Sequence, residues 1–180
     1  MMEEIVISRP KVQDYEQLAS FFRLVLTDTF IQNDIQEQKE DLEAEIRNKL
    51  LYLTQDLRSQ GKRRYFLTAW RGEQIIGTIE AGTANDLIRS SISPEYQQLP
   101  EVGTILVHPE AQRQGIATRL LTGIVSFLHE QGCSQFCLDS GYPIAQRIWK
   151  RRFGEPAYTL KDQWGPGADH LIWIIDITGK

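Results

Sequence analysis

The chain has 180 residues, of which 41% are hydrophobic and 24% charged, and its formal net charge is −4. This length fits one globular domain, so we expect a single domain over residues 1–180. The acidic balance argues against nucleic acid or an anionic membrane as the main partner, and no apolar run approaches the ~20 residues of a membrane span. The acidic N-terminus lacks a signal-peptide core, which predicts a cytoplasmic protein.

The first elements are predicted to be a short strand and a helix. Residues 4–8 have strand character, and the Arg9-Pro10 pair ends it. Asp14 and Gln17 have the spacing of a capping box, so a helix is expected to begin there. Its apolar face would consist of Tyr15, Leu18, Phe22 and Val25.

A second helix and a hairpin follow in the predicted order. Gly61 ends the helix, and residues 65–70 and 74–80 are strands joined by a tight turn at Arg71-Gly72. Residues 81–100 show neither period and contain several turn-forming pairs, so we expect a long loop. Loops of this length are commonly functional. The buried stripe of the helix is Leu42, Ile46, Leu50, Leu53 and Leu57.

The next segment predicts a strand, a turn and an amphipathic helix. Residues 102–107, apart from Gly103, are apolar and β-branched enough for a strand buried on both faces, and His108-Pro109 ends it. The helix is expected to begin after Gly115 and to stop at Gly132. Its apolar face would consist of Ile116, Leu120, Leu121, Ile124, Val125 and Leu128.

The turn between this strand and this helix suits a phosphate. Gly115 has no side chain and Ala117 only a methyl group, so a ligand could approach the backbone closely. First-turn N–H groups and the helix dipole favour an anion there by roughly 0.3–1 kcal/mol. The Walker A and Rossmann glycine patterns are absent. A pyrophosphate site is therefore the hypothesis, and a plain strand-turn-helix junction is the alternative.

The C-terminal third completes the order of elements. Residues 135–139 are a predicted strand, and Pro143 opens a helix through Ile144, Ile148 and Trp149. Residues 156–160 and 170–178 are the last predicted strands. The order β-α-α-β-β-β-α-β-α-β-β predicts an α/β fold, with a mixed central sheet flanked by helices on both faces.

Residues 102–121 resemble motif A of the GCN5-related N-acetyltransferase (GNAT) superfamily. Members have a strand ending in V-x-P and then Gln/Arg-x-x-Gly-x-Gly/Ala, and Gln112, Gly115 and Ala117 occupy the marked positions. Residues 136–154 are similar to motif B, but Trp149 stands where a tyrosine is usual and Arg152 where a glycine is usual. The order of elements is also that of the family, so the resemblance implies a single-domain GNAT-like fold over 1–180.

The resemblance implies transfer of an acetyl group from acetyl-CoA to a primary amine, of a small molecule or a peptide, by direct attack in a ternary complex. Ile105, Leu106 and Val107 would bind the pantetheine amides, with the Leu106 amide as backbone oxyanion donor. Trp149 would line the pantetheine channel or hold the sulfur, with packing as the alternative. The loop and first helical turn would bind the pyrophosphate, through Gln112, Arg113, Gln114, Gly115, Ile116, Ala117 and Thr118.

The resemblance also calls for a base, because an alkylammonium with a pKa near ~10 must lose a proton before it attacks. Family members place a carboxylate near the amine at positions that match Glu80 and Glu101, and we predict one of these two as the base. Asp139 is a third choice, with a bond to local backbone as its alternative. Tyr142 and Tyr158 are candidate substitutes for the missing tyrosine acid.

The histidines, the cysteines and the basic clusters are predicted to have structural roles or to be solvated. His108 is predicted to be a turn residue, and the turn before His170, near Trp164, to be a surface turn or a flap. Cys133 and Cys137 are expected to be reduced thiols in or near the core. Neither they nor the scattered histidines have metal-site spacing, so we expect no metal. The basic clusters 62–64 and 150–152 are expected to be solvated, with cofactor-phosphate contact as the alternative.

Two questions stay open at the level of sequence. The acceptor amine is not identified, because a polyamine, an aminoglycoside, an amino acid or a protein amine all fit an acidic protein. The departure at Trp149 leaves a CoA-binding sensor or interaction module without transferase activity as the alternative function. A third possible function is that of a purely structural protein that dimerises through strand edges. A homodimer is compatible with the resemblance.

Overall fold

The computed structural model describes residues 3–177, and its contacts divide these into two compact units. The first unit comprises the chain up to Ala81 and Thr104–Phe127, and the second comprises Gly82–Gly103 and the chain from Leu128. Hydrogen bonding orders seven strands as β1-β2-β3-β4-β5-β7-β6 in one mixed sheet, flanked by helices. The predicted α/β fold class is confirmed. Thr178, the predicted end of the last strand, lies outside the described residues.

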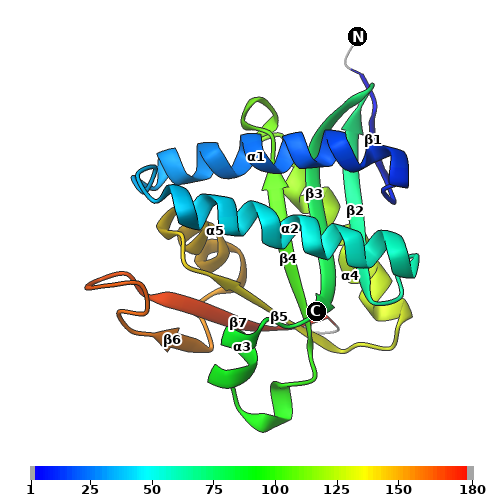
Figure 1. Cartoon of the computed structure of the whole chain (residues 1–180). Coiled ribbons are helices and arrows are strands. Elements are labelled where there is room, and N and C mark those ends of the chain that lie inside the picture. Colours follow the sequence, from blue (N-terminus) through cyan, green and yellow to red (C-terminus); the bar gives the residue numbers. More distant parts are fainter. Residues whose placement is uncertain (1–2, 178–180) are drawn as a thin grey trace. The chain divides into compact units, whose positions relative to one another are not determined.

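The first unit has two helices on one face of its strands. Its elements are β1 (Ile5–Ser8), α1 (Tyr15–Gln32), α2 (Lys39–Ser59), β2 (Arg64–Arg71), most of β3 (Gln74–Thr83), the end of β4 (Pro100–Val107) and most of α4 (Ile116–Glu130). Figure 1 shows α1 and α2 side by side in front of β2 and β3, with α4 behind them. Successive strand residues point to opposite faces. Phe66 accordingly joins the core under α1 and α2, whereas Leu67 touches Gly123 of α4.

The predicted start and face of α1 are confirmed, but its capping box is wrong. Leu18, Phe22 and Val25 are buried. Asp14 ends a 3-10 turn, Val12–Asp14, and its carboxylate accepts the Lys11 N–H at 2.8 Å, while the Gln17 amide donates to the Glu73 carbonyl at 2.8 Å. The turn before the helix already places Asp14 in helical backbone geometry, so its side chain points back along the chain.

The second unit contains α3 (Asp86–Ser91), the start of β4, β5 (Gln135–Ser140), α5 (Pro143–Phe153), β6 (Tyr158–Leu160) and β7 (His170–Asp176). β5 and β7 pair antiparallel from Gln135↔Asp176 to Ser140↔Leu171, and β4 is parallel to β5 with Glu101 opposite Cys137. These pairings bring the start of β4, the end of β5 and the start of β7 next to one another. Several of the polar residues described below lie on these three segments.

The predicted loop over residues 81–100 is wrong. β3 continues to Thr83, and α3 begins after Asn85, whose Oδ1 accepts the Ile88 N–H at 2.9 Å. Ile88 and Ile92 are buried in the core of the second unit. An asparagine N-cap followed by two isoleucines four residues apart is a helix signal. The helix has only six residues, too few for its periodicity to stand out from the turn-forming residues around it.

No helix in residues 3–177 combines the length and apolar character that a membrane crossing requires. In the same residues, no group of three or more His, Cys, Asp or Glu side chains is arranged to hold a metal ion.

Candidate functional site

The end of β4 is less buried than its sequence predicts. The expectation of a strand covered on both faces holds for Val102, which is buried, but Ile105, Leu106 and Val107 are only half-buried. Apolar, β-branched residues give the same strand pattern whether one face or both are covered, so the sequence could not distinguish the two cases. The last three residues of β4 therefore keep part of their surface accessible.

The turn after β4 is held by His108. Its backbone N–H donates to the Ile76 carbonyl of β3 at 2.9 Å, and its Nδ1 accepts the Glu110 N–H at 3.2 Å, which caps the 3-10 turn Pro109–Ala111. The predicted role of His108 as a turn residue is confirmed. Because both its backbone and its ring anchor the turn, the chain leaves β4 in a defined direction.

The loop from Gln112 to Gly115 is exposed, and the side chain of Gln114 fixes it by two hydrogen bonds. Gln114 accepts from Arg71 at 2.7 Å and donates to the Glu110 carbonyl at 3.0 Å. Gly115 has φ +79°, and a Cβ built on it meets no atom within 4 Å, so the space beside it is open. The Arg119 N–H donates to the Gly115 carbonyl, as in the first turn of a helix. The N–H groups of residues 116–118 lie within that turn, where a helix has no preceding carbonyl of its own to accept them. Phosphates in proteins are often bound at the first turn of a helix, so the pyrophosphate site stays a prediction for this loop.

A close contact with β3 sets the position of α4. A Cβ added at Gly77 would lie 2.9 Å from Ile116 Cγ2 and 2.9 Å from Leu120 Cδ1, and 3.4 Å from the Leu106 carbonyl oxygen. Only a glycine allows this approach. Gly77 thus fixes the first turn of α4 relative to the strand that precedes the loop.

Glu80, one of the two predicted bases, is in a buried ion pair. Its Oε1 accepts from Arg64 at 2.8 Å, and its Oε2 accepts from the hydroxyl of Thr104. Glu80 is 1% exposed and Arg64 4%. The expectation that the basic cluster 62–64 is solvated is therefore wrong for Arg64, because this side chain turns inward to a carboxylate 16 residues away. Both oxygens of Glu80 are engaged.

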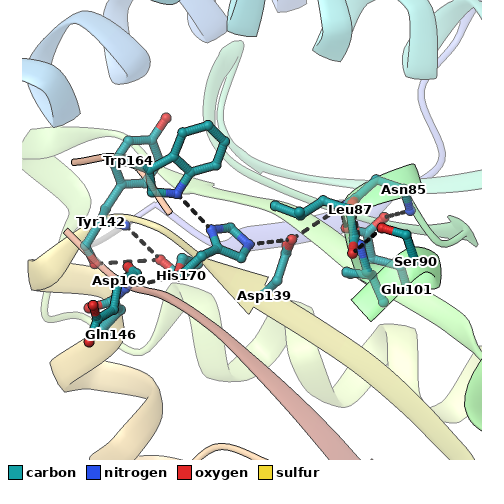
Figure 2. A network of polar contacts seen from close by, with 12 residues as sticks. Asn85, Leu87, Ser90, Glu101, Asp139, Tyr142, Gln146, Trp164, Asp169 and His170 are labelled. Atoms are coloured by element: carbon teal, nitrogen blue, oxygen red, sulfur yellow. Dashed lines mark hydrogen bonds and ion pairs between the residues drawn. The ribbon is translucent and has the colours of Figure 1, made fainter. Parts of the chain in front are cut away.

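Glu101, the other predicted base, is joined to Asp139 by an asparagine. Asn85 donates its side-chain amide to Glu101 Oε1 at 2.8 Å and to Asp139 Oδ2 at 3.1 Å, and its backbone N–H donates to Glu101 Oε2 at 3.2 Å. Figure 2 shows the amide between the two carboxylates. The interpretation of Asp139 as a residue bonded only to local backbone is wrong, because its carboxylate faces side chains of α3 and β7.

The network continues from Asp139 through His170 to Trp164. His170 Nε2 lies 2.8 Å from Asp139 Oδ2, and Trp164 Nε1 donates to His170 Nδ1 at 3.1 Å (Figure 2). An indole N–H can only donate, so Nδ1 must be the acceptor and Nε2 must carry the proton given to Asp139. Trp164 thereby selects the neutral tautomer of His170. Gly141 lies so close that an added Cβ would be 2.9 Å from Trp164 Nε1.

The turn that carries Trp164 is tied down by hydrogen bonds. Trp164 N–H donates to Ala168 O at 3.0 Å, and Asp162 N–H donates to Asp169 Oδ1 at 2.9 Å. Gly167 N–H donates to Asp162 Oδ1 at 2.7 Å. The segment is an exposed turn with internal hydrogen bonds. The Trp164 ring is 60% exposed, over a His170 that is 6% exposed.

The aromatic residues that replace the usual tyrosine have structural contacts. Trp149 is 8% exposed and stacks on Phe153 with centroids 5.8 Å apart. The Tyr158 hydroxyl donates to Ser93 Oγ at 3.0 Å and accepts the Ser93 N–H at 3.1 Å. Ile148, next to Trp149 in the same helix, is 50% exposed, because the helix turns Trp149 inward instead. Lys150, Arg151 and Arg152 are exposed, as expected.

The carboxylates of the second unit affect a neighbouring thiol. Burial first, and then the negative charges of Glu101 and Asp139, raise the pKa of Cys137 to about 12. Cys133 is partly exposed, and both cysteines are free thiols, as predicted. The raised pKa makes Cys137 a poor nucleophile at neutral pH.

Sequence reasoning missed Asn85 and underrated Trp164 and His170. Asn85 could have been found as an N-cap, but its second role as a bridge depends on residues 16 and 54 positions away. His170 and Asp139 come from strands that pair only in the tertiary structure.

Known structures share this fold. The PaiA N-acetyltransferase of Thermoplasma acidophilum, in complex with coenzyme A, is 18% identical with a TM-score of 0.67, over 94% of this chain and 97% of that one. A ribosomal-protein-alanine N-acetyltransferase of Brucella melitensis is 19% identical with a TM-score of 0.67, over 95% and 99%. YncA of Salmonella typhimurium, with acetyl-CoA, is 12% identical with a TM-score of 0.67, over 98% and 95%.

No curated protein matches the sequence. A family model does, over residues 25–155, and its description is the acetyltransferase (GNAT) family. The matched range includes β4, the exposed loop, α4 and the strand of Asp139, which are the elements that carry motifs A and B. The predicted class of acyl-CoA-dependent N-acyltransferase follows from this match, and the chain belongs to the GNAT family of acetyltransferases.

Proposed function

We propose that this protein transfers an acetyl group from acetyl-CoA to a primary amine by direct attack in a ternary complex. The observation that carries the proposal is the half-buried end of β4 followed by an exposed loop, with open space at Gly115 and the first turn of α4 behind it. The family's relatives solved with coenzyme A and acetyl-CoA support the choice of cosubstrate. Its two free cysteines fit a reducing compartment such as the cytoplasm.

The cosubstrate would be held mainly by backbone groups. The backbone groups of the half-buried Ile105, Leu106 and Val107 would bind the pantetheine amides, and Trp149 would line the channel. The pyrophosphate would lie against the loop and the first turn, at Gln112, Arg113, Gln114, Gly115, Ile116, Ala117 and Thr118. Acetyl-CoA supplies an activated thioester, whose carbonyl oxygen would accept the Leu106 N–H. One such donor is worth about 3 kcal/mol in the transition state.

Of the three candidate carboxylates, the geometry favours Asp139 as the proton acceptor. Both Glu80 oxygens are engaged by an arginine and a hydroxyl, and Glu101 is 6% exposed with both oxygens on Asn85. The Asp139 side chain is 17% exposed, and Asn85 and His170 orient it. Asp139 would accept the proton of the amine, and Glu101 would hold Asn85 in place.

A CoA-binding sensor without transferase activity is the second candidate function. Trp149 favours it, because an indole cannot protonate the departing thiolate as a tyrosine could. A thiol titrates near ~8.5, however, so its thiolate leaves without strong acid assistance. Transfer to an amine therefore does not require a proton donor at this position.

Calorimetric titration with acetyl-CoA, followed by thiol-release assays with a panel of amines, tests both functions. Micromolar binding with turnover on an amine supports the transferase, and binding with no turnover on polyamines, aminoglycosides, amino acids and N-terminal peptides supports the sensor. The panel also identifies the acceptor class.

Gly115→Glu should abolish binding, because it places bulk and negative charge where the pyrophosphate lies. Gly132→Glu is its matched control. Gly132, after the other end of α4, has φ +82° against +79° at Gly115, and a Cβ there also meets no atom within 4 Å. Both variants carry the same backbone strain and the same charge. Equal affinity in the two variants would remove the loop from the cofactor site.

A further inference from the structure

Thr104 has an unusual backbone conformation at the start of the proposed pantetheine-binding segment. Its φ is +48°, a value that β-branched residues rarely adopt, and it is 5% exposed. It immediately precedes Ile105, Leu106 and Val107. A change of φ at Thr104 would rotate the peptide groups of these three residues relative to the rest of the first unit.

Thr104 is held in this conformation by β3. Its hydroxyl donates to Glu80 Oε2, and its carbonyl accepts the Thr78 hydroxyl at 2.9 Å. The side chain and the backbone of Thr104 are thus bonded to two residues two positions apart on the same strand. Rare backbone conformations persist when surrounding contacts over-determine them, and these two contacts do so.

Glu80 is itself fixed by a chain of contacts that reaches α2. Arg64 donates to Glu80 Oε1 at 2.8 Å and, through Nε, to Gln55 Oε1 at 3.2 Å. The Arg64 guanidinium also lies over the Tyr52 ring, 3.8 Å from its centroid. A planar guanidinium bonded on two edges and stacked on one face has little freedom. Glu80 therefore presents its second oxygen to Thr104 from a fixed position.

We propose that Glu80 is a positioning residue that keeps Thr104 at positive φ and thereby aims the backbone of residues 105–107 at the cosubstrate. This inference rests on the proposed function for its binding segment. It gives Glu80 a different task from the base predicted from sequence, because it acts on cosubstrate affinity and takes no proton. Loss of the Glu80 contact should therefore raise Kd and KM for acetyl-CoA and leave the pH dependence of kcat unchanged.

Two substitutions at Thr104 test the contact without breaking the ion pair. Thr104→Val keeps the β-branched shape and removes the hydroxyl, whereas Thr104→Ser keeps the hydroxyl. We expect Thr104→Val to weaken acetyl-CoA binding about tenfold, as expected for a lost bond to a buried carboxylate, and Thr104→Ser to bind like the parent protein. Equal affinities in the two variants would contradict the proposal.

A glycine at position 104 should make Glu80 dispensable for binding. Glycine adopts positive φ without steric cost. We expect Glu80→Gln to weaken acetyl-CoA binding about tenfold when residue 104 is threonine and less than about twofold in the Thr104→Gly background. The same loss in both backgrounds would mean that Glu80 acts by another route. A flattened pH profile for Glu80→Gln would restore the base role.

Asp56→Asn is the control for a merely structural effect. Asp56 is fully buried in the same unit. Its carboxylate accepts hydrogen bonds from the two terminal guanidinium nitrogens of Arg9 at 2.9 and 3.0 Å and from the Phe66 N–H at 2.6 Å. This variant should lower stability but leave acetyl-CoA affinity unchanged at a temperature where it is folded. A tenfold loss of affinity from Asp56→Asn would mean that any destabilised first unit binds poorly, which would overturn the positioning role.

A spectroscopic measurement tests the positioning role of Glu80 separately from the proposed function. The Cα and Cβ chemical shifts of Thr104 report its φ in the protein without any ligand. Thr104→Ser should keep the left-handed shifts at residue 104, and Glu80→Gln should move those of Thr104 toward extended values. If the parent protein does not bind acetyl-CoA, the proposed function fails, and these shifts still decide whether Glu80 holds Thr104. Unmoved shifts in Glu80→Gln would refute the positioning role whatever the affinities.

Discussion

The two units solve the problem of buried carboxylates in opposite ways. In the first unit, Glu80 is paired with a guanidinium and a hydroxyl and is sealed from solvent. In the second, Glu101 and Asp139 share the amide of Asn85, and Asp139 also accepts from a neutral His170. A guanidinium cancels the charge of its partner, whereas an amide or an imidazole orients a carboxylate and leaves its charge in place.

The difference matters for chemistry. An ion-paired, sealed carboxylate is suited to fix a backbone, because moving it would leave a buried charge behind. An oriented carboxylate that keeps its charge and 17% of its side-chain surface can attract a cation or take a proton. Burial, and then the negative charges of Glu101 and Asp139, raise the pKa of the neighbouring Cys137. This difference supports the two proposals, a positioning role for the first network and proton transfer for the second.

The largest expected effect is on stability. Arg64→Met should lower the free energy of unfolding by about 3–5 kcal/mol, because it leaves Glu80 buried without its cation. Asn85→Ala, in the second network, should cost only about 1–3 kcal/mol for the cap and the bridge. Urea unfolding followed by circular dichroism measures both. Equal losses would break the distinction between a charge-compensated and an oriented network.

The next effect is on turnover. Asp139→Asn should lower kcat about 100- to 1,000-fold with acetyl-CoA affinity unchanged, as expected for loss of a general base. Asp176→Asn is a matched control, because Asp176 lies on β7 and accepts only from Gln135 at 2.7 Å among the hydrogen bonds described for it. If Asp139→Asn keeps its turnover and Glu101→Gln loses it, the roles of the two carboxylates are reversed.

A smaller effect is expected from the tautomer of His170. Trp164→Phe removes the donor to Nδ1, so Asp139 alone would orient the ring, and kcat should fall about fivefold, the equivalent of one hydrogen bond. Nitrogen-15 shifts of the His170 ring measure the tautomer directly: Nε2 should carry the proton in the parent protein. Finding the proton on Nδ1 there would contradict the bond from Trp164.

The smallest effect is on thiol reactivity. With a pKa of about 12, Cys137 should react with thiol reagents at pH 8 much more slowly in the native protein than the partly exposed Cys133 does. In a Cys133→Ser background, Glu101→Gln removes one negative neighbour, lowers the pKa of Cys137, and should speed its alkylation about threefold. An unchanged rate would mean that Glu101 carries no charge in the native state.

Much of the segment proposed to bind the cosubstrate could be predicted from the sequence. The V-H-P strand end, the loop with Gly115 and the apolar face of α4 are encoded by residues at most four positions apart, whose contacts follow from strand and helix periodicity. The structure confirms these elements within a few residues. The half-burial of residues 105–107 could not be predicted from the sequence, because the residue pattern of a strand does not show how many of its faces are covered.

The network of Asn85, Glu101, Asp139 and His170 could not be predicted in the same way. Asn85 contacts Asp139, 54 positions away, and Asp139 contacts His170, 31 positions away. Asp139 in an Asp-Ser-Gly sequence looks like a turn residue until β7 pairs with β5 and brings His170 within hydrogen-bond distance of its carboxylate. Likewise, Arg64 looks like one of three solvated basic residues until Glu80 of the neighbouring strand faces it.

The sequence by itself determined the family, the order of elements and the loop between β4 and α4, because local patterns of glycine, proline and apolar residues specify helices, strands and turns. Only the tertiary structure decided which carboxylate is sealed by a cation and which is held by neutral donors. That assignment depends on strand pairing and burial, and residues distant in the chain become electrostatic neighbours only when the sheet has formed.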